Sequence, residues 1–178
     1  MKNVVVGISD CQVCAGPDSQ LVTYALGSCI AVCAWDPLNK VGGMLHFMLP
    51  ESSLDSNKAQ ATPCMFGDTG IPHLLDAVCR LGADKRRLVI TLTGGAQVLD
   101  QQGIFNIGKR NHLAARKALW KCGAMAAAEE VGGEVSRTVR LNVENGKLLI
   151  REGGGTEKEL APRGAKEGLN GIPRPGGR

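Results

Sequence analysis

The sequence predicts a single α/β (α+β) domain, in which a mixed β-sheet core is covered by two main helices. Three observations support this prediction. The chain has 178 residues of which 43% are hydrophobic, which is enough to bury one sizeable core. Its N-terminal half consists of short apolar stretches separated by Gly, Pro and Asp turns, as is typical of strands. Two later stretches carry apolar residues at helical spacing.

The N-terminal half is predicted to be rich in strands. The polar, serine-rich residues 50–65 have no sustained period and are expected to form a long loop. The apolar run at residues 30–35 fits either a buried strand or a short helix, since periodicity alone does not separate the two. Strands are expected at residues 3–8, 12–15, 21–25 and 40–49.

The two helices follow in the second half of the chain. Residues 72–81 are predicted to be helical, because Pro72 suits a first turn and Gly82 a helix end. The second helix is expected to run from Asn111, acting as its N-cap, to Gly123. These helices would cover the sheet that the strands form.

Further strands and a tail complete the predicted organisation. A strand is expected at residues 88–92, and an Asn-Gly step between apolar alternations predicts a hairpin of residues 135–142 and 146–151. The last 28 residues contain eight glycines, three prolines and few large apolar side chains. Such a composition cannot offset the entropy of ordering. We therefore expect a domain over residues 1–152 and a basic, disordered tail over residues 153–178.

Composition excludes several classes of function. The net charge is only +4 and aromatic residues make up 3% of the chain, so a nucleic-acid surface is poorly supported. No segment is apolar and long enough for a membrane span or a secretory signal. The seven cysteines are an odd number, and several lie in apolar patterns where a reduced thiol behaves as a small hydrophobe. A cytoplasmic location is expected, with neither nucleic acid nor membrane insertion.

Cys29 and His46 are the best candidates for chemistry. Cys29 follows the Gly27-Ser28 step, where a sharp turn can present the thiol at the mouth of an element. His46 lies on a predicted strand, a rigid support from which an imidazole can reach the thiol. Such a pair fits a hydrolase of amides or esters, because a thiol with a pKa near ~8.5 needs a base at neutral pH. Taken alone, the pair fits a buried structural cysteine and a core histidine better than a catalytic pair, because one cysteine and one histidine occur in most chains.

Thr23 can complete this arrangement if the chain reverses at Gly27. Its hydroxyl would then accept a hydrogen bond from the His46 ring and fix the tautomer of that ring. A threonine in a strand is also common for its β-propensity alone. The spacing therefore leaves the role of Thr23 open.

The Cys11-Gln-Val-Cys14 motif invites a metal or redox interpretation, which the rest of the sequence does not support. A zinc site needs four ligands, and the remaining candidates are scattered singly along the chain. A thioredoxin-like motif would open a helix, whereas a Gly-Pro step follows here. A structural or incidental role is favoured, and neither a metal nor an organic cofactor is expected. The scattered candidates are Cys64, His73 and His112.

A glycine-rich connection follows the strand predicted at residues 88–92. Gly94 and Gly95 are followed at a distance by Arg110 and Asn111, but the spacing matches neither a P-loop nor a dinucleotide-binding fingerprint. A nucleotide site is therefore not predicted. The connection is expected to pack closely and to position Arg110.

Four motifs together, in order and with compatible spacing over about residues 2–155, resemble the bacterial chemotaxis family CheD. The agreement of separate motifs is more specific than a lone cysteine and histidine. The motifs are Thr23-x2-Leu26-Gly27-Ser28-Cys29, Gly43-Met44-x-His46-x-Met48-Leu49-Pro50, Gly94-Gly95-Ala96 with Ile107-Gly108-x-Arg110-Asn111, and Thr138-Val139-Arg140 leading to Asn145-Gly146-Lys147-Leu148.

The resemblance implies a chemoreceptor glutamine deamidase, which converts glutamine side chains on methyl-accepting chemotaxis receptors to glutamate without a cofactor. It implies that Cys29 is the nucleophile, His46 the base and Thr23 the third catalytic residue. The turn at Gly27 and Ser28 would hold the oxyanion. The implied fold is a layered sandwich similar to that of bacterial deamidating toxins. Some members of this family also bind the phosphatase CheC.

The substrate glutamine would lie on a long receptor helix, so an open groove is expected. The candidate walls are residues 50–65 and the segment from Gly94 to Asn111. Two alternatives remain at this point. The chain would act mainly as a binding module that stimulates a CheC-type phosphatase, or as a cysteine hydrolase of another protein amide or ester.

Overall fold

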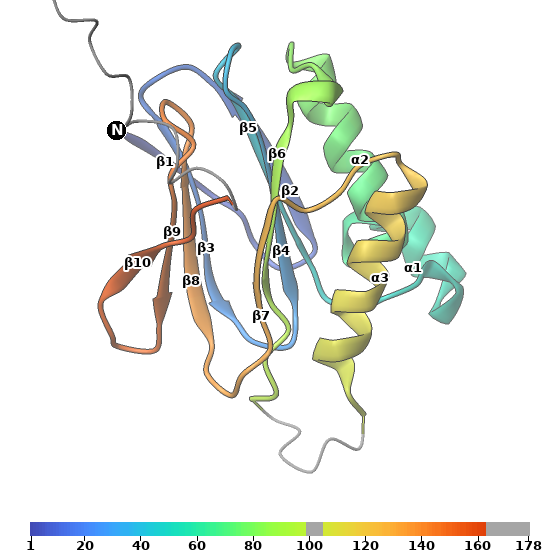
Figure 1. The fold of residues 1–178 in the computed structure, drawn as a ribbon. Coiled ribbons are helices and arrows are strands. Elements are labelled where there is room, and N and C mark those ends of the chain that lie inside the picture. Colours follow the sequence, from blue (N-terminus) through green and yellow to red (C-terminus); the bar gives the residue numbers. More distant parts are fainter. Residues whose placement is uncertain (99–104, 163–178) are drawn as a thin grey trace, which may run out of the picture.

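The computed structural model describes residues 1–98 and 105–162, which form three layers (Figure 1). Two five-stranded sheets face each other, and the helices cover the outer face of the second sheet. The first sheet contains, in spatial order, β1 (Lys2–Val5), β3 (Ser19–Leu26), β8 (Arg137–Asn142), β9 (Leu148–Glu152) and β10 (Glu157–Glu159). The second sheet contains β2 (Asp10–Ala15), β5 (Val41–Phe47), β4 (Ile30–Asp36), β6 (Val89–Gly94) and β7 (Ala128–Val131).

The predicted α/β (α+β) layered fold is confirmed, and the sheet core consists of two mixed sheets. Each sheet joins antiparallel neighbours to one parallel pair, β1 with β3 and β6 with β7. The second sheet is buried on both faces, because the first sheet covers one and the helices the other. This explains the unbroken apolar run that left residues 30–35 undecided: they belong to β4, with Val32 turned to the helices and Cys33 to the first sheet.

Helix α2 (Gly67–Arg80) begins five residues earlier than predicted, and Pro72 lies inside it rather than in its first turn. Glycine has a low helix propensity, so the sequence does not indicate a helix that begins at Gly67. Here glycine allows the helix to approach the sheet. A Cβ on Gly67 would lie 3.0 Å from the Phe47 ring, and one on Gly70 would lie 3.0 Å from Leu45. Close packing on β5 therefore decides where this helix begins.

Helix α3 (Ile107–Lys121) also begins before its predicted start. Its N-cap is Asn106, in a left-handed conformation with φ of 47°, so the prediction that Asn111 caps this helix is wrong. Asn111 instead lies buried within the helix. Gly108 meets Gly95 so closely that a side chain at Gly108 would collide with the Gly95 backbone, and one at Gly95 would lie only 3.0 Å from the Gly108 carbonyl oxygen. This contact fixes α3 against the glycine-rich connection that follows β6.

Residues 50–65, predicted to be a loop, contain short helices. Asp55 caps α1 (Ser56–Ala61) by accepting a hydrogen bond of 3.0 Å from the Lys58 amide. The segments before and after α1 form single 3-10 turns, η1 (Ser52–Leu54) and η2 (Pro63–Met65). A further turn, η3 (Lys85–Arg87), precedes β6.

The predicted hairpin is present as β8 and β9. Two strands were not predicted, β7 and β10, and both lie at sheet edges. The β10 strand falls within the segment predicted to be a tail and pairs with β9. Residues 163–178 of that segment lie outside the described residues.

Candidate active site

Thr23 and His46 meet across the interface between the two sheets. Thr23 lies on β3 of the first sheet and His46 on β5 of the second, and both are buried, with 0% and 1% of their surface exposed. The distance from Thr23 Oγ1 to His46 Nδ1 is 2.8 Å. The hydrogen bond expected from the sequence is therefore present between two rigid elements.

The hydrogen-bond partners of Thr23 determine the tautomer of His46. Thr23 Oγ1 also lies 2.8 Å from the Val6 carbonyl oxygen, which can only accept. A hydroxyl has a single proton, so donating it to Val6 leaves only acceptor capacity toward the imidazole. His46 Nδ1 must then carry the proton, and Nε2 has the free electron pair. Among the described residues Nε2 is buried and has no hydrogen-bond partner.

The turn that carries Cys29 lies between β3 and β4 and is fixed through its carbonyl oxygens. The Ala96 amide donates to the Gly27 carbonyl at 2.9 Å, and the Gly95 amide donates to the Cys29 carbonyl at 2.8 Å. The remaining carbonyl of the turn accepts from the Asn111 side chain at 3.0 Å, and the same amide group donates to the carbonyl of Met48. The turn thus depends on the glycine-rich connection and on α3.

Cys29 opens onto a cavity of about 610 Å³ at this end of the molecule. The thiol side chain is half-buried there, whereas Thr23 and His46 lie deeper, between the sheets. The walls are mainly apolar. The lining residues include Gly27, Ser28, Ala96, Val98, Phe105, Ile107 and Gly108.

The predicted groove residues are placed unequally by the structure. Gly94, Gly95 and Asn111 are buried and do not line the cavity, although Gly95 and Asn111 hold the Cys29 turn. Arg110 is exposed on α3 and is not among the lining residues either. Other residues between Gly94 and Asn111 do line the cavity, whereas residues 50–65 contribute none to it. The lining residues from this segment are Ala96, Gln97, Val98, Phe105, Ile107 and Gly108.

Burial dominates the electrostatics of the candidate pair. Burial raises the pKa of the Cys29 thiol, and its own backbone amide offsets this only in part. Burial also lowers the pKa of His46 to about 4. At neutral pH the two groups are therefore a neutral thiol and a neutral imidazole, which is the form that can accept a proton.

Arg137 was not predicted from the sequence. It is 5% exposed and links the two sheets at this end of the molecule. Its guanidinium donates to the Gly132 carbonyl at 2.8 Å and pairs with Glu152 at 3.0 Å. Arg137 occupies an inward position of the predicted hairpin, and an arginine at such a position was the available signal.

The CxxC motif is not a single site. Both cysteines lie on β2, where Cys11 packs against the helix-side core and Cys14 against the core between the sheets. Positions three apart on a strand point to opposite faces. A ligand set shared by these two thiols is therefore ruled out.

Cys29 is a half-buried thiol at a cavity, and two residues later Ala31 pairs with His46, whose imidazole is buried, oriented and neutral. A cysteine and a histidine placed in this way are typical of hydrolases that use a cysteine nucleophile. The sequence comparisons narrow this class. Residues 48–152 match the family model described as CheD chemotactic sensory transduction. The chain belongs to the CheD family.

Several relatives align over nearly their whole length. "Probable chemoreceptor glutamine deamidase CheD" of Solibacter usitatus is 49% identical over 170 residues, covering 96% of this chain and 100% of the relative. A homologue from Syntrophus aciditrophicus is 49% identical over 90% of this chain and 100% of its own length. "Chemoreceptor glutamine deamidase CheD" of Thermotoga maritima is 41% identical over 86% of this chain and 94% of its own.

The alignment with the Solibacter relative covers 96% of this chain, so it includes Cys29 and His46. The family-model match begins at residue 48, after both of them. Within residues 1–98 and 105–162, no helix has the length and apolar character needed to cross a membrane.

Proposed function

We propose that this chain is a protein-glutamine deamidase that converts glutamine side chains of chemoreceptors to glutamate and releases ammonia. One observation carries the proposal: Thr23 orients His46 so that the buried Nε2 has a free electron pair. His46 pairs with Ala31 of β4, two residues after Cys29. The names of the full-length relatives support the same substrate class. A cytoplasmic location, and action without a cofactor, are part of this proposal.

The first step forms a thioester. The sulfur of Cys29 attacks the carboxamide carbon while its proton passes to Nε2 of His46, because both groups are neutral at rest. When the tetrahedral intermediate collapses, the C–N bond breaks and His46 returns that proton to the departing ammonia. The glutamyl group is then bound to the sulfur of Cys29.

The second step uses water. His46 removes a proton from the water as its oxygen attacks the thioester carbon. The C–S bond breaks, the sulfur takes the proton back from His46, and glutamate is released. Thr23 keeps the proton on Nδ1 in both steps, so that Nε2 is always the atom that exchanges protons.

The turn at Gly27 and Ser28 is the candidate oxyanion site. Its three carbonyl oxygens, including that of Cys29, already accept hydrogen bonds from other parts of the chain. Within the described residues, no backbone carbonyl accepts a hydrogen bond from the Cys29 amide. That amide remains close to the reacting sulfur, where it can stabilise the developing negative charge.

The cavity wall suggests how a receptor helix is bound. Val98 and Phe105 are exposed apolar residues beside Cys29, and they bracket the end of the glycine-rich connection. Such residues suit an amphipathic helix that presents a glutamine from its surface. Gly94, Gly95, Arg110 and Asn111, the groove residues predicted from sequence, would support this wall rather than form it.

A mass measurement tests the proposal. Cytoplasmic fragments of a chemoreceptor are incubated with the wild-type protein, with Cys29→Ala and with Cys33→Ala, whose side chain is buried in β4 away from the cavity. We expect specific glutamine peptides to gain ~1 Da with the wild type and with Cys33→Ala, and none to do so with Cys29→Ala. If folded wild-type protein changes no receptor peptide, the proposed activity is wrong for that receptor.

The same variant separates the alternatives. A protein that serves mainly as a binding module would stimulate a CheC-type phosphatase equally well as wild type and as Cys29→Ala. A cysteine hydrolase of another amide or ester would leave receptor peptides unchanged while still needing Cys29 for its own substrate. Binding of a CheC-type phosphatase in addition to deamidation remains compatible with the proposal.

A further inference from the structure

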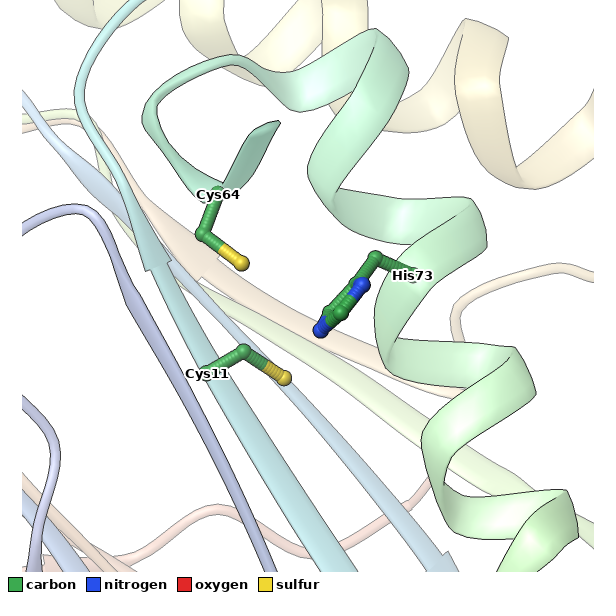
Figure 2. Close-up of side chains that lie close together, drawn as sticks. All are labelled: Cys11, Cys64 and His73. Atoms are coloured by element: carbon green, nitrogen blue, oxygen red, sulfur yellow. The ribbon is translucent and has the colours of Figure 1, made fainter. Parts of the chain in front are cut away.

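Cys11, Cys64 and His73 converge on the side of the second sheet that faces the helices (Figure 2). They come from three separate elements, β2, η2 and α2, although they are distant in sequence. Their ligand atoms, two sulfurs and one ring nitrogen, all lie within 4.8 Å of one another. Figure 2 shows both sulfurs and the imidazole ring directed into the same space.

We propose that these three side chains bind a zinc ion. Two thiolates and one imidazole are a ligand set that zinc prefers, with Zn–S distances near ~2.3 Å and Zn–N distances near ~2.0 Å. A tetrahedral ion at those distances needs ligand atoms roughly 3.5 to 4 Å apart. The cluster reaches this spacing with small side-chain movements. A zinc ion at this position would give a role to Cys11, which the CxxC motif did not explain.

The charge and the burial of the cluster fit such an ion. Two thiols would release their protons to solvent on binding, so that two thiolates neutralise the double charge of the metal. Cys64 is buried and Cys11 partly buried, which protects the sulfurs, whereas His73 is exposed at the open side. With three protein ligands among the described residues, the fourth position is left for water on that side.

The position of the cluster indicates what the metal would stabilise. β2 is an edge strand, and its Cys11 pairs with Leu45 of β5 next to the pair of Asp10 with His46. Leu45 faces the helices and His46 the first sheet, so the zinc would lie on the opposite face of β5 from the catalytic candidates. It would join the edge strand β2 to η2 and to the middle of α2, beside the strand that carries His46.

Metal content of the full-length protein tests the proposal directly. The protein is purified with a phosphine reductant, incubated with zinc, desalted and analysed by elemental mass spectrometry. We expect about one zinc ion per chain for the wild type, and loss of most of it in Cys11→Ser and Cys64→Ser. His73→Ala should bind at least about 10-fold more weakly.

Two controls exclude other thiols. Cys14→Ser removes the other cysteine of β2, which faces the first sheet, and Cys29→Ala removes the thiol at the cavity; both should retain the ion. Cobalt substitution should give a thiolate-to-metal charge-transfer band that Cys11→Ser and Cys64→Ser abolish. The proposal is overturned if the reduced wild type retains no zinc, or if zinc content is the same in Cys11→Ser and Cys64→Ser as in the wild type. It is independent of deamidation, because metal content is read without any substrate.

Discussion

The paired strands β4 and β5 carry a buried polar side chain near each end of their ladder. The two side chains differ in how many of their polar atoms have hydrogen-bond partners. Near one end, where His46 pairs with Ala31, the imidazole has one hydrogen bond, and its Nε2 has no partner among the described residues. At the other end, where Asp36 pairs with Val41, the buried carboxylate accepts from three backbone amides and from two nitrogens of Arg87. The same two strands thus carry one polar group that is fully satisfied and one that is not.

The pKa directions reflect this difference. Burial alone would raise the pKa of Asp36, but Arg87 and the backbone amides hold it well below its usual range. Burial lowers the pKa of His46 with no compensating partner. A satisfied buried charge stabilises the fold only in one protonation state, whereas an unsatisfied neutral nitrogen costs stability and remains available for proton transfer. We infer that one end of the ladder serves the fold and the other the reaction.

The largest expected effect is on the rate of deamidation and comes from a change beside His46. Thr23→Val keeps the shape of the side chain but removes the acceptor of the Nδ1 proton, so His46 loses its fixed tautomer. We expect kcat for receptor deamidation to fall by about 100-fold to 1,000-fold, with little change in KM. Thr23→Ser, which restores the hydroxyl, should recover most of the activity. A wild-type kcat in folded Thr23→Val would contradict the role given to Thr23.

The next largest effect is on the free energy of unfolding and comes from a change at Asp36. Asp36→Ala should lower the free energy of unfolding by about 3 kcal/mol, because it leaves buried amides and a guanidinium without their partner. Asp55→Ala, which removes only an exposed helix cap, should cost about 1 kcal/mol. Urea unfolding measures both. Equal losses in the two variants would show that the buried hydrogen bonds of Asp36 stabilise the fold no more than an exposed helix cap does.

The pH dependence of stability tests the burial of His46. Its pKa is 6.5 as the ordinary value and about 4 in the folded protein, so the unfolded chain binds the proton more readily. This contribution to stability is complete above the ordinary value and is lost as the pH falls toward about 4. Between about pH 7 and about pH 5 we expect a loss of about 2 kcal/mol.

His46→Asn is the matched control, since its amide can still donate to Thr23 but does not titrate. Between about pH 7 and about pH 5, the free energy of unfolding of the variant, measured in urea, should fall by about 2 kcal/mol less than that of the wild type. An identical pH slope in the two proteins would show that His46 is not held neutral by burial.

The smallest effect concerns Cys29 itself. Because burial raises its pKa and His46 is neutral at rest, few thiolates exist at neutral pH. The rate of alkylation by iodoacetamide, followed on the peptide that contains Cys29, should increase about tenfold per pH unit from about pH 6 to about pH 8. A rate that is constant over this interval would instead indicate a preformed thiolate and imidazolium pair.

Much of the sheet structure was predictable, because alternation and turn residues identify strands such as β3, β5 and the β8–β9 hairpin. The helix starts were not. Gly67 and Gly70 weaken a helical pattern and are explained only by the close approach of α2 to β5. Asn111 fits a helix cap by residue type, yet its contacts with the Cys29 turn come from a distant part of the chain.

The candidate site shows the same limit. A cysteine after a glycine turn and a histidine on a strand can be found by inspection, and the motif order supplied Thr23. The sequence does not show that Val6 takes the Thr23 proton, because that contact joins a residue inside β3 to the residue that follows β1. Nor does it show that Cys11 meets Cys64 and His73 rather than Cys14. These are tertiary contacts, which local patterns do not encode.

Trapping the covalent intermediate shows whether Cys29 is the nucleophile. Wild-type protein is mixed with a receptor fragment, quenched in acid and digested, and the peptide that contains Cys29 is analysed by mass spectrometry. We expect an adduct on Cys29 whose mass equals the sum of the two peptides minus ammonia, ~17 Da. Conversion of the receptor glutamine to glutamate without any such adduct, and at the same rate in Cys29→Ala, would contradict it.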